Sequence, residues 1–363
     1  MNKAFLFRIY PTKEQEILIK KTFGCVRFIY NQMLSDRDNC YEATGEYIQN
    51  TPASYKKKYV WLKEVDSLAL ANAQLHLDTA YRNFFRDPKV GFPQFKSRKD
   101  NNLSYTTNLV NGNIRFEEGF LVLPKLKRVK IRCHRMIPEG WKLKSVTIRK
   151  KPSGKYFASL LYEYESEVKK VEAKTFLGLD YAMNGLYVDS EGNEAGYPRY
   201  YRRMLERLKR EQRRLSACEK GSANREKQRI KVAKLHEKVT NQRNDFQHKL
   251  SRQIANAVDA VCVEDLNMRS MSQALKFGKS VADNGYGAFL IMLSYKLEEK
   301  GKHLVKVSKW YPSSKTCSCC GAIKEHLGLE ERIYQCECCG FEMDRDYNAS
   351  INIREEGKRI LFA

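Results

Sequence analysis

The sequence predicts an α/β domain with an inserted cysteine-rich ribbon, preceded by a helical unit and a small β-barrel. Strand and helix patterns alternate from residue 174 onward, residues 11–99 show helical periodicity, and short strand patterns dominate residues 100–168. Two matching Cys-x-x-Cys-Gly motifs interrupt the alternation near its end. With 363 residues and 42% apolar composition, the chain can bury a core in each of two or three compact units.

The helical unit at residues 11–99 is expected from two amphipathic segments. Thr12 is expected to cap the first helix, with Gln15 completing a capping box, and this helix runs to about Cys40. The second helix covers Ser67 to Phe85. Both segments repeat apolar side chains at a spacing of three to four residues, so the two helices are expected to pack together.

The β-barrel is expected from residues 1–10 together with residues 100–168. Its clearest strand patterns are Lys3 to Tyr10, Val129 to Cys133, Lys144 to Arg149 and Tyr156 to Tyr164. The last two are joined by Lys151-Pro152-Ser153-Gly154, which predicts a hairpin turn. A charged connector, Glu165 to Lys174, then leads into the next domain.

The α/β domain is expected at residues 174–363. Its predicted strands are Phe176 to Tyr181, Leu186 to Asp189, Ala260 to Val263 and His303 to Ser308. Asn184-Gly185 predicts a tight turn between the first two, and a helix from Gly285 to Lys300 precedes the last. This alternation of strands and helices implies parallel strand pairing.

Positive charge is concentrated in a predicted helical hairpin at residues 200–250. The 66 Lys and Arg against 43 Asp and Glu give a formal charge of +23, which favours nucleic acid as a partner. Sixteen of the basic residues and six of the acidic ones lie between Arg202 and Lys249. A solvated helix pair with alternating charges would explain the helicity but not this imbalance, so we interpret the hairpin as a nucleic-acid-binding surface. The candidate contact residues are Arg207, Arg210, Arg214 and Lys231.

The cysteines indicate one metal site in a reducing compartment. Six of the eleven crowd between Cys317 and Cys339, and the others are scattered singly, which does not resemble a disulfide framework. No apolar run approaches the roughly 18 residues of a membrane span, and the N-terminus lacks the apolar stretch of a signal peptide. We therefore expect a cytoplasmic protein with no membrane partner.

A ribbon at residues 312–343 is expected to bind structural zinc. Its two knuckles are separated by fifteen residues, and the four candidate ligands are Cys317, Cys320, Cys336 and Cys339. A glycine follows the second cysteine of each knuckle and permits the positive backbone torsion that closes such a turn. Cys319 and Cys338 offer other registers without that glycine, so we expect them to be non-ligands. Four protein ligands leave no open coordination position for chemistry.

Three carboxylates lie at the ends of predicted core elements. Asp180 follows the first apolar run, Glu264 ends the strand that begins at Ala260, and Asp346 lies beyond the ribbon where a helix starts. Neighbouring acids are costly unless cations neutralise them, and oxygen ligands suit Mg²⁺ or Mn²⁺. A pair of such ions can activate water and stabilise the leaving oxygen of a phosphodiester. Taken singly, the residues are ambiguous: Asp346 could cap a helix, Glu264 could be a surface acid and Asp180 could hold a turn.

Ordered motifs along nearly the whole chain resemble those of one known family. They are Lys3-Ala4-Phe5-Leu6-Phe7-Arg8-Ile9-Tyr10-Pro11, Gly91-Phe92-Pro93-Gln94-Phe95-Lys96, Asp245-Phe246-Gln247-His248-Lys249, Val263-Glu264-Asp265-Leu266-Asn267, Tyr311-Pro312-Ser313-Ser314-Lys315-Thr316-Cys317 and the run from Asp344 to Ile353. The family is TnpB (OrfB) of bacterial insertion sequences, related to the type V CRISPR effectors. Many relatives have glycine where this chain has Ala182; alanine is still small, so a dead site is not inferred.

The resemblance implies an architecture and a set of site residues. The α/β domain would be an RNase H-like RuvC nuclease domain, the β-barrel a wedge and the helical unit a recognition insert. The family's catalytic triad falls on Asp180, Glu264 and Asp346, with Mg²⁺ as the catalytic ion, and its zinc ligands fall on the four cysteines named above. Asp344 belongs to the same motif as Asp346, and we assign the metal role to the second aspartate.

The resemblance also implies an RNA-guided DNA endonuclease encoded by a transposon. Its guide RNA, derived from the transposon end, would pair with one strand of double-stranded target DNA, while basic residues hold the heteroduplex by its phosphates. The protein would read a short adjacent motif, with candidate readers between Tyr47 and Gln74 and near Tyr105 to Asn111. Two alternatives are a guide-dependent DNA-binding repressor that does not cleave, and an accessory transposase. The intact triad argues against the first, and the lack of a tyrosine-nucleophile motif with paired histidines argues against the second.

Overall fold

The computed structural model describes residues 1–48, 50–100, 103–183, 185–274, 278–328 and 330–363. It divides into two compact units, Met1–Ser166 and Glu167–Ala363. The boundary lies within the charged connector of the sequence. The predicted turn residue Asn184 lies outside the described residues.

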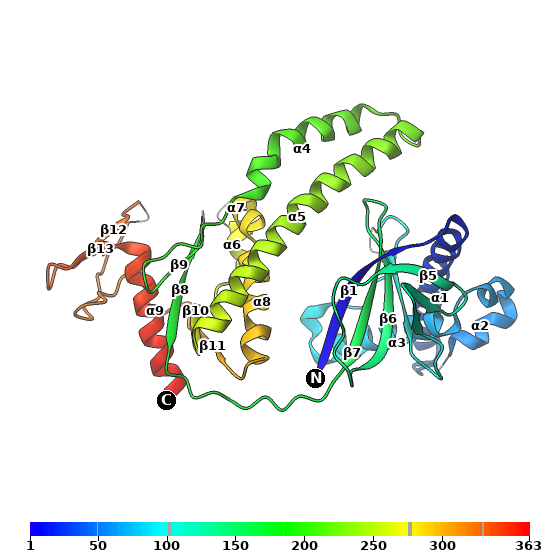
Figure 1. Ribbon diagram of the computed structural model, residues 1–363, viewed down its shortest axis with the longest axis horizontal. Coiled ribbons are helices and arrows are strands. Elements are labelled where there is room, and N and C mark those ends of the chain that lie inside the picture. Colours follow the sequence, from blue (N-terminus) through cyan, green and yellow to red (C-terminus); the bar gives the residue numbers. More distant parts are fainter. Residues whose placement is uncertain (49, 101–102, 184, 275–277, 329) are drawn as a thin grey trace. The chain divides into compact units, whose positions relative to one another are not determined.

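A seven-stranded antiparallel sheet forms the framework of the first unit (Figure 1). Its spatial order is β2-β6-β7-β1-β5-β4-β3, so the N-terminal strand lies in the middle. The strands are β1 (Asn2–Tyr10), β2 (Leu103–Asn108), β3 (Arg115–Glu117), β4 (Phe120–Leu123), β5 (Lys127–Arg132), β6 (Lys142–Lys150) and β7 (Tyr156–Glu163). The predicted turn between β6 and β7 forms, with the Gly154 N–H donating to the Lys151 carbonyl over 2.9 Å at a φ of +84°.

The helices of the first unit lie between β1 and β2 in the sequence. The expected capping box of Thr12 and Gln15 is present at the start of α1 (Lys13–Thr44), which ends at Gly45 in the left-handed conformation. The other helical elements are α2 (Pro52–Lys58), η1 (Val60–Glu64), α3 (Ser67–Arg86) and η2 (Pro88–Val90). We did not predict α2, whose start signal is Pro52 at the first helical turn. The strands and helices share one apolar core.

A four-stranded sheet forms the centre of the second unit. Its order is β11-β10-β8-β9, and the strands are β8 (Phe176–Ala182), β9 (Leu186–Asp189), β10 (Ala260–Glu264) and β11 (His303–Val307). β10 pairs in parallel with both β8 and β11, and β9 is antiparallel to β8. The predicted parallel pairing is therefore confirmed.

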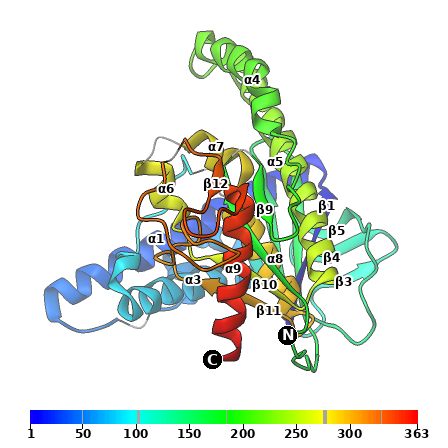
Figure 2. The same cartoon turned by 90° about the vertical axis from the view of Figure 1, so that its left-hand side faces the viewer.

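Helices cover both faces of this sheet (Figures 1 and 2). One face packs its leucines and valines against α5 (Ala223–Ala257) and α8 (Tyr286–Glu298). On the other face, Cys262 and Val305 pack against α9 (Arg345–Phe362). The remaining elements are α4 (Tyr200–Ala217), α6 (Met268–Ala274), α7 (Gly278–Asn284), β12 (Ile333–Gln335) and β13 (Glu342–Asp344). In the described part of the chain, no helix combines the length and the apolar character that crossing a membrane requires.

Candidate functional site

Asp180 and Glu264 lie beside each other at the carboxyl ends of β8 and β10. The strands are parallel and pair Leu179 with Val263, so the acid that follows each of these residues occupies the same level of the sheet. Leu179 and Val263 belong to the core on the α5 and α8 side. Because side chains alternate along a strand, both acids point to the opposite face, which α9 covers.

Two glycines allow α9 to lie directly on that face. A Cβ at Gly178 would lie 2.0 Å from the carbonyl oxygen of Ser350, and one at Gly357 would lie 2.2 Å from the cysteine sulfur of β10. Ser350 is about one helical turn beyond Asp346, and Gly178 is two residues before Asp180. The close contact therefore places the first turn of α9, with Asp346, beside the end of β8 that carries Asp180.

The Asp180 carboxyl group lies in an unfavourable electrostatic environment. Burial is the largest cause that raises its pKa well above the ordinary value, and the negative charges of Glu264 and Asp346 add to it. Burial also raises the pKa of Glu264, while a hydrogen bond donated by the Ser313 hydroxyl to its Oε1 acts in the opposite direction. A cation placed among these acids would remove much of the repulsion.

Arginine side chains flank the acids. The Arg345 Nη2 atom lies 3.2 Å from Asp346 Oδ1, and the Arg332 Nη1 atom lies 3.8 Å from Asp346 Oδ2. A cavity of about 740 Å³ is lined by Asp180 and Asp346 together with Arg199, Arg332 and Arg345. Carboxylates can bind a hard cation and guanidinium groups can pair with phosphate, so the cavity presents both kinds of group to one space.

The three predicted carboxylates are neighbours, but their oxygen atoms do not form a compact group of metal ligands. In addition to burial, the charges of both Glu264 and Asp346 raise the pKa of Asp180, and Asp180 and Asp346 line the same cavity. Among the described residues, however, the only group of candidate ligand atoms within 4.8 Å of one another is made of cysteines. The structure therefore gathers the acids at one end of the sheet and leaves space between them.

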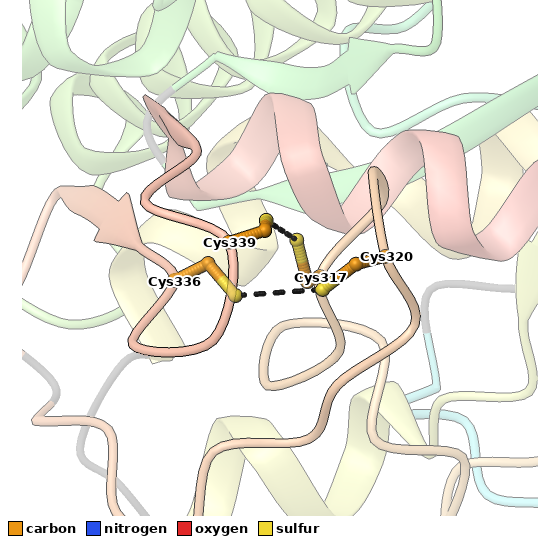
Figure 3. A group of neighbouring side chains, drawn as sticks. All are labelled: Cys317, Cys320, Cys336 and Cys339. Atoms are coloured by element: carbon orange, nitrogen blue, oxygen red, sulfur yellow. Dashed lines mark hydrogen bonds between the residues drawn. The ribbon is translucent and has the colours of Figure 1, made fainter.

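The cysteine group contains the four predicted ligands, Cys317, Cys320, Cys336 and Cys339 (Figure 3). The Cys317 and Cys339 sulfurs are 3.8 Å apart, and the Cys320 and Cys336 sulfurs are 3.6 Å apart. Four thiolates around one tetrahedral zinc ion, each about 2.3 Å from it, would lie about 3.8 Å apart. The cluster therefore has the dimensions that such an ion needs.

Both halves of the cluster use the same backbone turn. The Gly321 N–H donates to the Cys317 carbonyl over 2.9 Å, and the Gly340 N–H donates to the Cys336 carbonyl over 3.0 Å. Both glycines adopt positive φ, +78° and +72°. The Cys339 backbone N–H is the largest cause that lowers the pKa of the Cys336 thiol to about 6. The thiolate is the form that binds metal, and the pKa values of the other three cluster thiols are raised.

The two remaining cysteines of the ribbon stay outside the cluster. Cys319 and Cys338 are exposed, and neither belongs to the group of candidate ligands. The glycine argument separated them from the ligand set, because only the chosen cysteine pairs are followed by a residue that can adopt positive φ.

Buried asparagines attach the ribbon to α9. The Asn348 side chain donates to the Thr316 carbonyl over 2.8 Å and accepts from the Ser318 N–H over 3.0 Å. One turn later, the Asn352 side chain donates to the Ser313 carbonyl over 2.8 Å. We missed these residues in the sequence. Their signal is a pair of amides four residues apart on a helix face that also carries apolar residues.

The predicted basic contact residues lie on the hairpin of α4 and α5 (Figure 1). Arg207, Arg210, Arg214 and Lys231 are all exposed. Part of their charge is used within the hairpin, since Glu211 Oε1 lies 3.0 Å from the Arg214 guanidinium and 3.8 Å from that of Arg210. The sixteen basic residues against six acidic ones between Arg202 and Lys249 leave the hairpin strongly basic.

Three protein-family models match the chain. OrfB_IS605, described as "Probable transposase", covers residues 159–275, which include Asp180 and Glu264. A Cas12f1-like TNB domain covers residues 286–353, which include the four cysteines and Asp346. A helix-turn-helix domain of the OrfB_IS605 group covers residues 1–46, which form β1, α1 and the residues around them in this structure.

Known proteins resemble the chain along nearly its whole length. A Streptomyces pristinaespiralis protein, provisionally named an RNA-guided DNA endonuclease, is 36% identical over 98% of this chain and 90% of its own. The Escherichia coli protein InsQ, with the same provisional name, is 27% identical over 99% of this chain and 93% of its own. The cryo-EM structure of a Cas12f1–sgRNA–target DNA complex covers 98% of both chains with a TM-score of 0.58 at 14% identity. The last comparison shows a shared fold.

Proposed function

This chain belongs to the OrfB (TnpB) family, and from that membership we propose that it is a transposon-encoded, RNA-guided DNA endonuclease. A relative 36% identical over 98% of the chain carries that provisional name, and the complex of similar fold contains an sgRNA and target DNA. The observation that carries the proposal is the placement of Asp180, Glu264 and Asp346 on one face at one end of the sheet. Acids so placed need a cation, and phosphodiester hydrolysis uses one.

The proposal includes the finer architecture. Residues 174–363 would be a RuvC-like nuclease domain of the RNase H type, with the ribbon at residues 312–343 inserted before its last helix. The seven-stranded sheet would be the wedge-like β-barrel, formed by residues 1–10 and 100–168, and residues 11–99 would be the helical recognition insert. The strand order β11-β10-β8-β9, with α9 on one face and α5 and α8 on the other, supports this division.

Asp180, Glu264 and Asp346 would hold Mg²⁺, with Mn²⁺ as a substitute. Their oxygen atoms suit hard cations. Burial first, and then the charges of Glu264 and Asp346, raise the pKa of Asp180, and a bound cation would offset both effects. Bound Mg²⁺ supplies activated water and stabilises the leaving oxygen. The protein's own contribution is orientation: Ser313 fixes one Glu264 oxygen, and Arg345 fixes one Asp346 oxygen.

The four cysteines would hold structural zinc. Their sulfur separations fit a tetrahedral ion, and every coordination position would be filled by the chain. Zinc would therefore stabilise the ribbon. It would not take part in hydrolysis.

Guide RNA and double-stranded target DNA would be the partners. Base pairing would select the sequence, and the exposed hairpin residues Arg207, Arg210, Arg214 and Lys231 would bind phosphates without reading bases. The readers of a target-adjacent motif would lie in the first unit, within Tyr47 to Gln74 or Tyr105 to Asn111. The cytoplasm stays the expected compartment.

The decisive experiment tests Asp180. The full chain is purified with its copurifying RNA, the RNA is sequenced, and a duplex matching the guide portion is offered with Mg²⁺. We expect cutting by the parent and a loss of about 10³-fold or more with Asp180→Asn, since a metal ligand is removed. The matched control is Glu165→Gln, which makes the same carboxylate-to-amide change at an exposed residue of the charged connector and should cut like the parent.

The same experiment separates the proposal from its alternatives. Asp180→Asn removes one of three mutually repelling charges, so its metal-free form should melt no lower than the parent, and lost cutting cannot be attributed to unfolding. A parent that binds matched duplex and never cuts it would indicate the guide-dependent repressor. Covalent protein–DNA adducts would indicate the transposase named in the family description. Undiminished cutting by Asp180→Asn would contradict the assigned site.

A further inference from the structure

Trp310 is the most exposed aromatic residue in the part of the chain that the structure describes, with 82% of its surface accessible. A structured turn holds it outward: the Tyr311 N–H donates to the Ser308 carbonyl over 3.0 Å, and the Trp310 N–H donates to the Ser308 hydroxyl over 3.3 Å. Tyr311 packs against the apolar core beside α9. The neighbouring residue therefore takes the inward position, and the indole remains in solvent.

The indole borders a hollow of about 630 Å³ at the end of the sheet that carries Glu264. Its lining consists of Asp265, Leu266, Asn267, Met268, Ser308, Lys309 and Trp310. Four of these residues follow Glu264 directly in the chain, and the other three follow β11, the next strand of the sheet. The Asp265 N–H donates to the Val307 carbonyl over 2.9 Å, which joins the two loops. The hollow is therefore built on the same strand end that carries Glu264.

The charges of this hollow suit a nucleotide. Asp265 is the one acid among the lining residues, and the Lys306 ammonium lies 2.8 Å from its Oδ1. The Lys309 ammonium lies 4.7 Å from the centre of the Trp310 ring, within the range of a cation–π contact. An aromatic face with a cation at its edge can stack a base and attract the adjoining phosphate.

We propose that Trp310 and Lys309 form a stacking platform that holds an unpaired nucleotide of the strand entering the carboxylate site. The inference rests on the proposed function and deepens it, because it names the single-stranded form as the one presented to Glu264. Base stacking on an aromatic ring is tolerant of sequence, as a guide-directed enzyme requires. A volume of about 630 Å³ also falls in the usual range of ligand sites.

Nucleic acid is favoured over a protein partner by the charge of the chain and by the position of the hollow. The chain carries a formal charge of +23, and the hollow shares a strand end with acids of the kind that cleave phosphodiesters. An exposed tryptophan in a protein-binding surface usually lies among other apolar anchors. Here the neighbouring lining residues are mostly polar or charged.

The test measures binding of a short fluorescein-labelled oligothymidylate to the full chain by anisotropy, with Mg²⁺ omitted so that no cutting occurs. We expect Trp310→Ala to weaken binding by about 5- to 100-fold, the range for loss of one stacked base. Trp310→Phe keeps a smaller ring and should recover part of the affinity. The parent's tryptophan emission should be quenched on binding, and that quenching should be smaller in Trp310→Phe.

Phe362→Ala is the matched control, because Phe362 is 67% exposed and lies at the opposite end of α9 from the acids. Its oligothymidylate affinity should equal that of the parent. Equal affinity of Trp310→Ala and the parent, with no quenching, would overturn the inference. Altered sedimentation of Trp310→Ala without nucleic acid, with unchanged oligothymidylate binding, would assign the residue to a contact between copies and would also overturn it.

The outcomes distinguish this inference from the proposed function. If the parent cuts guide-matched duplex and Trp310→Ala retains full affinity for oligothymidylate, the platform is wrong and the nuclease stands. If the parent never cuts but Trp310→Ala still loses affinity, the platform stands as a single-strand binding site and the nuclease assignment fails.

Discussion

The cysteine cluster and the carboxylate site are two candidate metal sites in one unit, built in opposite ways. The cysteines lie in two short turns, and the groups that close each turn come from within five residues of it. The acids come from β8, β10 and α9, which are far apart in sequence, and only strand register and the close contact at Gly178 make them neighbours. One site is local, and the other exists only in the folded unit.

The two sites also differ in the way their charge is treated. The Cys339 backbone N–H is the largest cause that lowers the pKa of Cys336 to about 6, whereas the pKa values of the other three cluster thiols are raised. At Asp180 the surroundings raise the pKa, with burial first and the neighbouring acids next. Within its own turn the Cys336 thiolate is therefore stabilised, whereas the surroundings of Asp180 do not stabilise its carboxylate. Under the proposed function, the ribbon would hold its metal permanently and the carboxylate site would hold a cation that can exchange with solvent.

The largest expected effect is at the cluster. Cys336→Ser should lower the zinc content from about one ion per chain towards none, because loss of one thiolate undermines a site whose folding is coupled to metal binding. Elemental analysis would measure the zinc, and limited proteolysis would report an opened ribbon. Cys338→Ser is the matched control: it lies two residues away, is exposed and is outside the cluster, so it should keep its metal. Equal zinc content in both variants would contradict the assignment.

The next largest effect tests assembly of the carboxylate site. Gly178→Ala would place a Cβ 2.0 Å from the Ser350 carbonyl, so α9 must move away from β8. We expect the unfolding free energy, measured by urea denaturation, to fall by about 3 kcal/mol. We also expect cutting, measured by the duplex assay, to fall by more than this loss of stability alone would cause. Gly24→Ala, which meets no atom within 4 Å, should be neutral or slightly stabilising.

Gly357→Ala tests the contact of α9 with the sheet at a second position. Its Cβ would lie 2.2 Å from the Cys262 Sγ and 2.5 Å from the Cys262 Cβ, so the added substitution Cys262→Gly, which removes both atoms, should recover part of the stability. No side-chain substitution should rescue Gly178→Ala. A rescue of both variants, or of neither, would show that the contact at Gly178 is not special.

A smaller effect tests the connection between the two sites. Asn348→Ala leaves the Ser318 N–H without its side-chain partner, while the Thr316 carbonyl keeps the Asn352 amide at 2.6 Å, and we expect a loss of about 1 kcal/mol. The ribbon should become more sensitive to protease while the zinc content stays near one ion per chain, because the knuckle turns close without Asn348. Unchanged stability and protease resistance would show that the ribbon is held by other contacts.

The smallest effect on cutting concerns a buried charge outside both sites. Lys296 on α8 is 2% exposed, and burial is the largest cause that lowers its pKa from 10.5 to about 8. Between those values the unfolded chain binds the proton and the folded chain does not, so this residue's contribution to stability increases as pH rises from about 8 to 10.5. Relative to Lys296→Met, the parent should therefore gain up to about 3 kcal/mol over that window, with cutting unaffected. A constant difference in chemical denaturation at each pH would contradict this.

What the sequence could predict follows the same division between local and assembled features. The capping box at Thr12, the turn at Gly154 and the two knuckles depend on residues within a few positions of one another, and all are present. The parallel pairing of β8 and β10 followed from the alternation of strands and helices. The three acids were named from their positions at element ends and from the family resemblance, and their roles stay a proposal.

The contacts around the acids could not be predicted, because they depend on packing between distant elements. Ser313 reaches Glu264 only because β10 and the start of the ribbon come together, and Arg332 reaches Asp346 only through the ribbon's hairpin. The sequence alone does not distinguish Asn348 from an exposed polar residue of a helix, and only the structure shows that it is buried. Neither composition nor spacing along the chain contains this information.

The close contact of α9 with the sheet fixes the number of residues in two short stretches of the chain. Gly178 and Asp180 are separated by one residue, as are Cys262 and Glu264, and each pair shares the face against which α9 rests. Inserting a single residue within either stretch would turn its acid through half a rotation, into the leucine and valine layer on the far side. Such a change should abolish cutting even though it alters no side chain, whereas a residue added at the exposed turn between α4 and α5 should leave the acids in place.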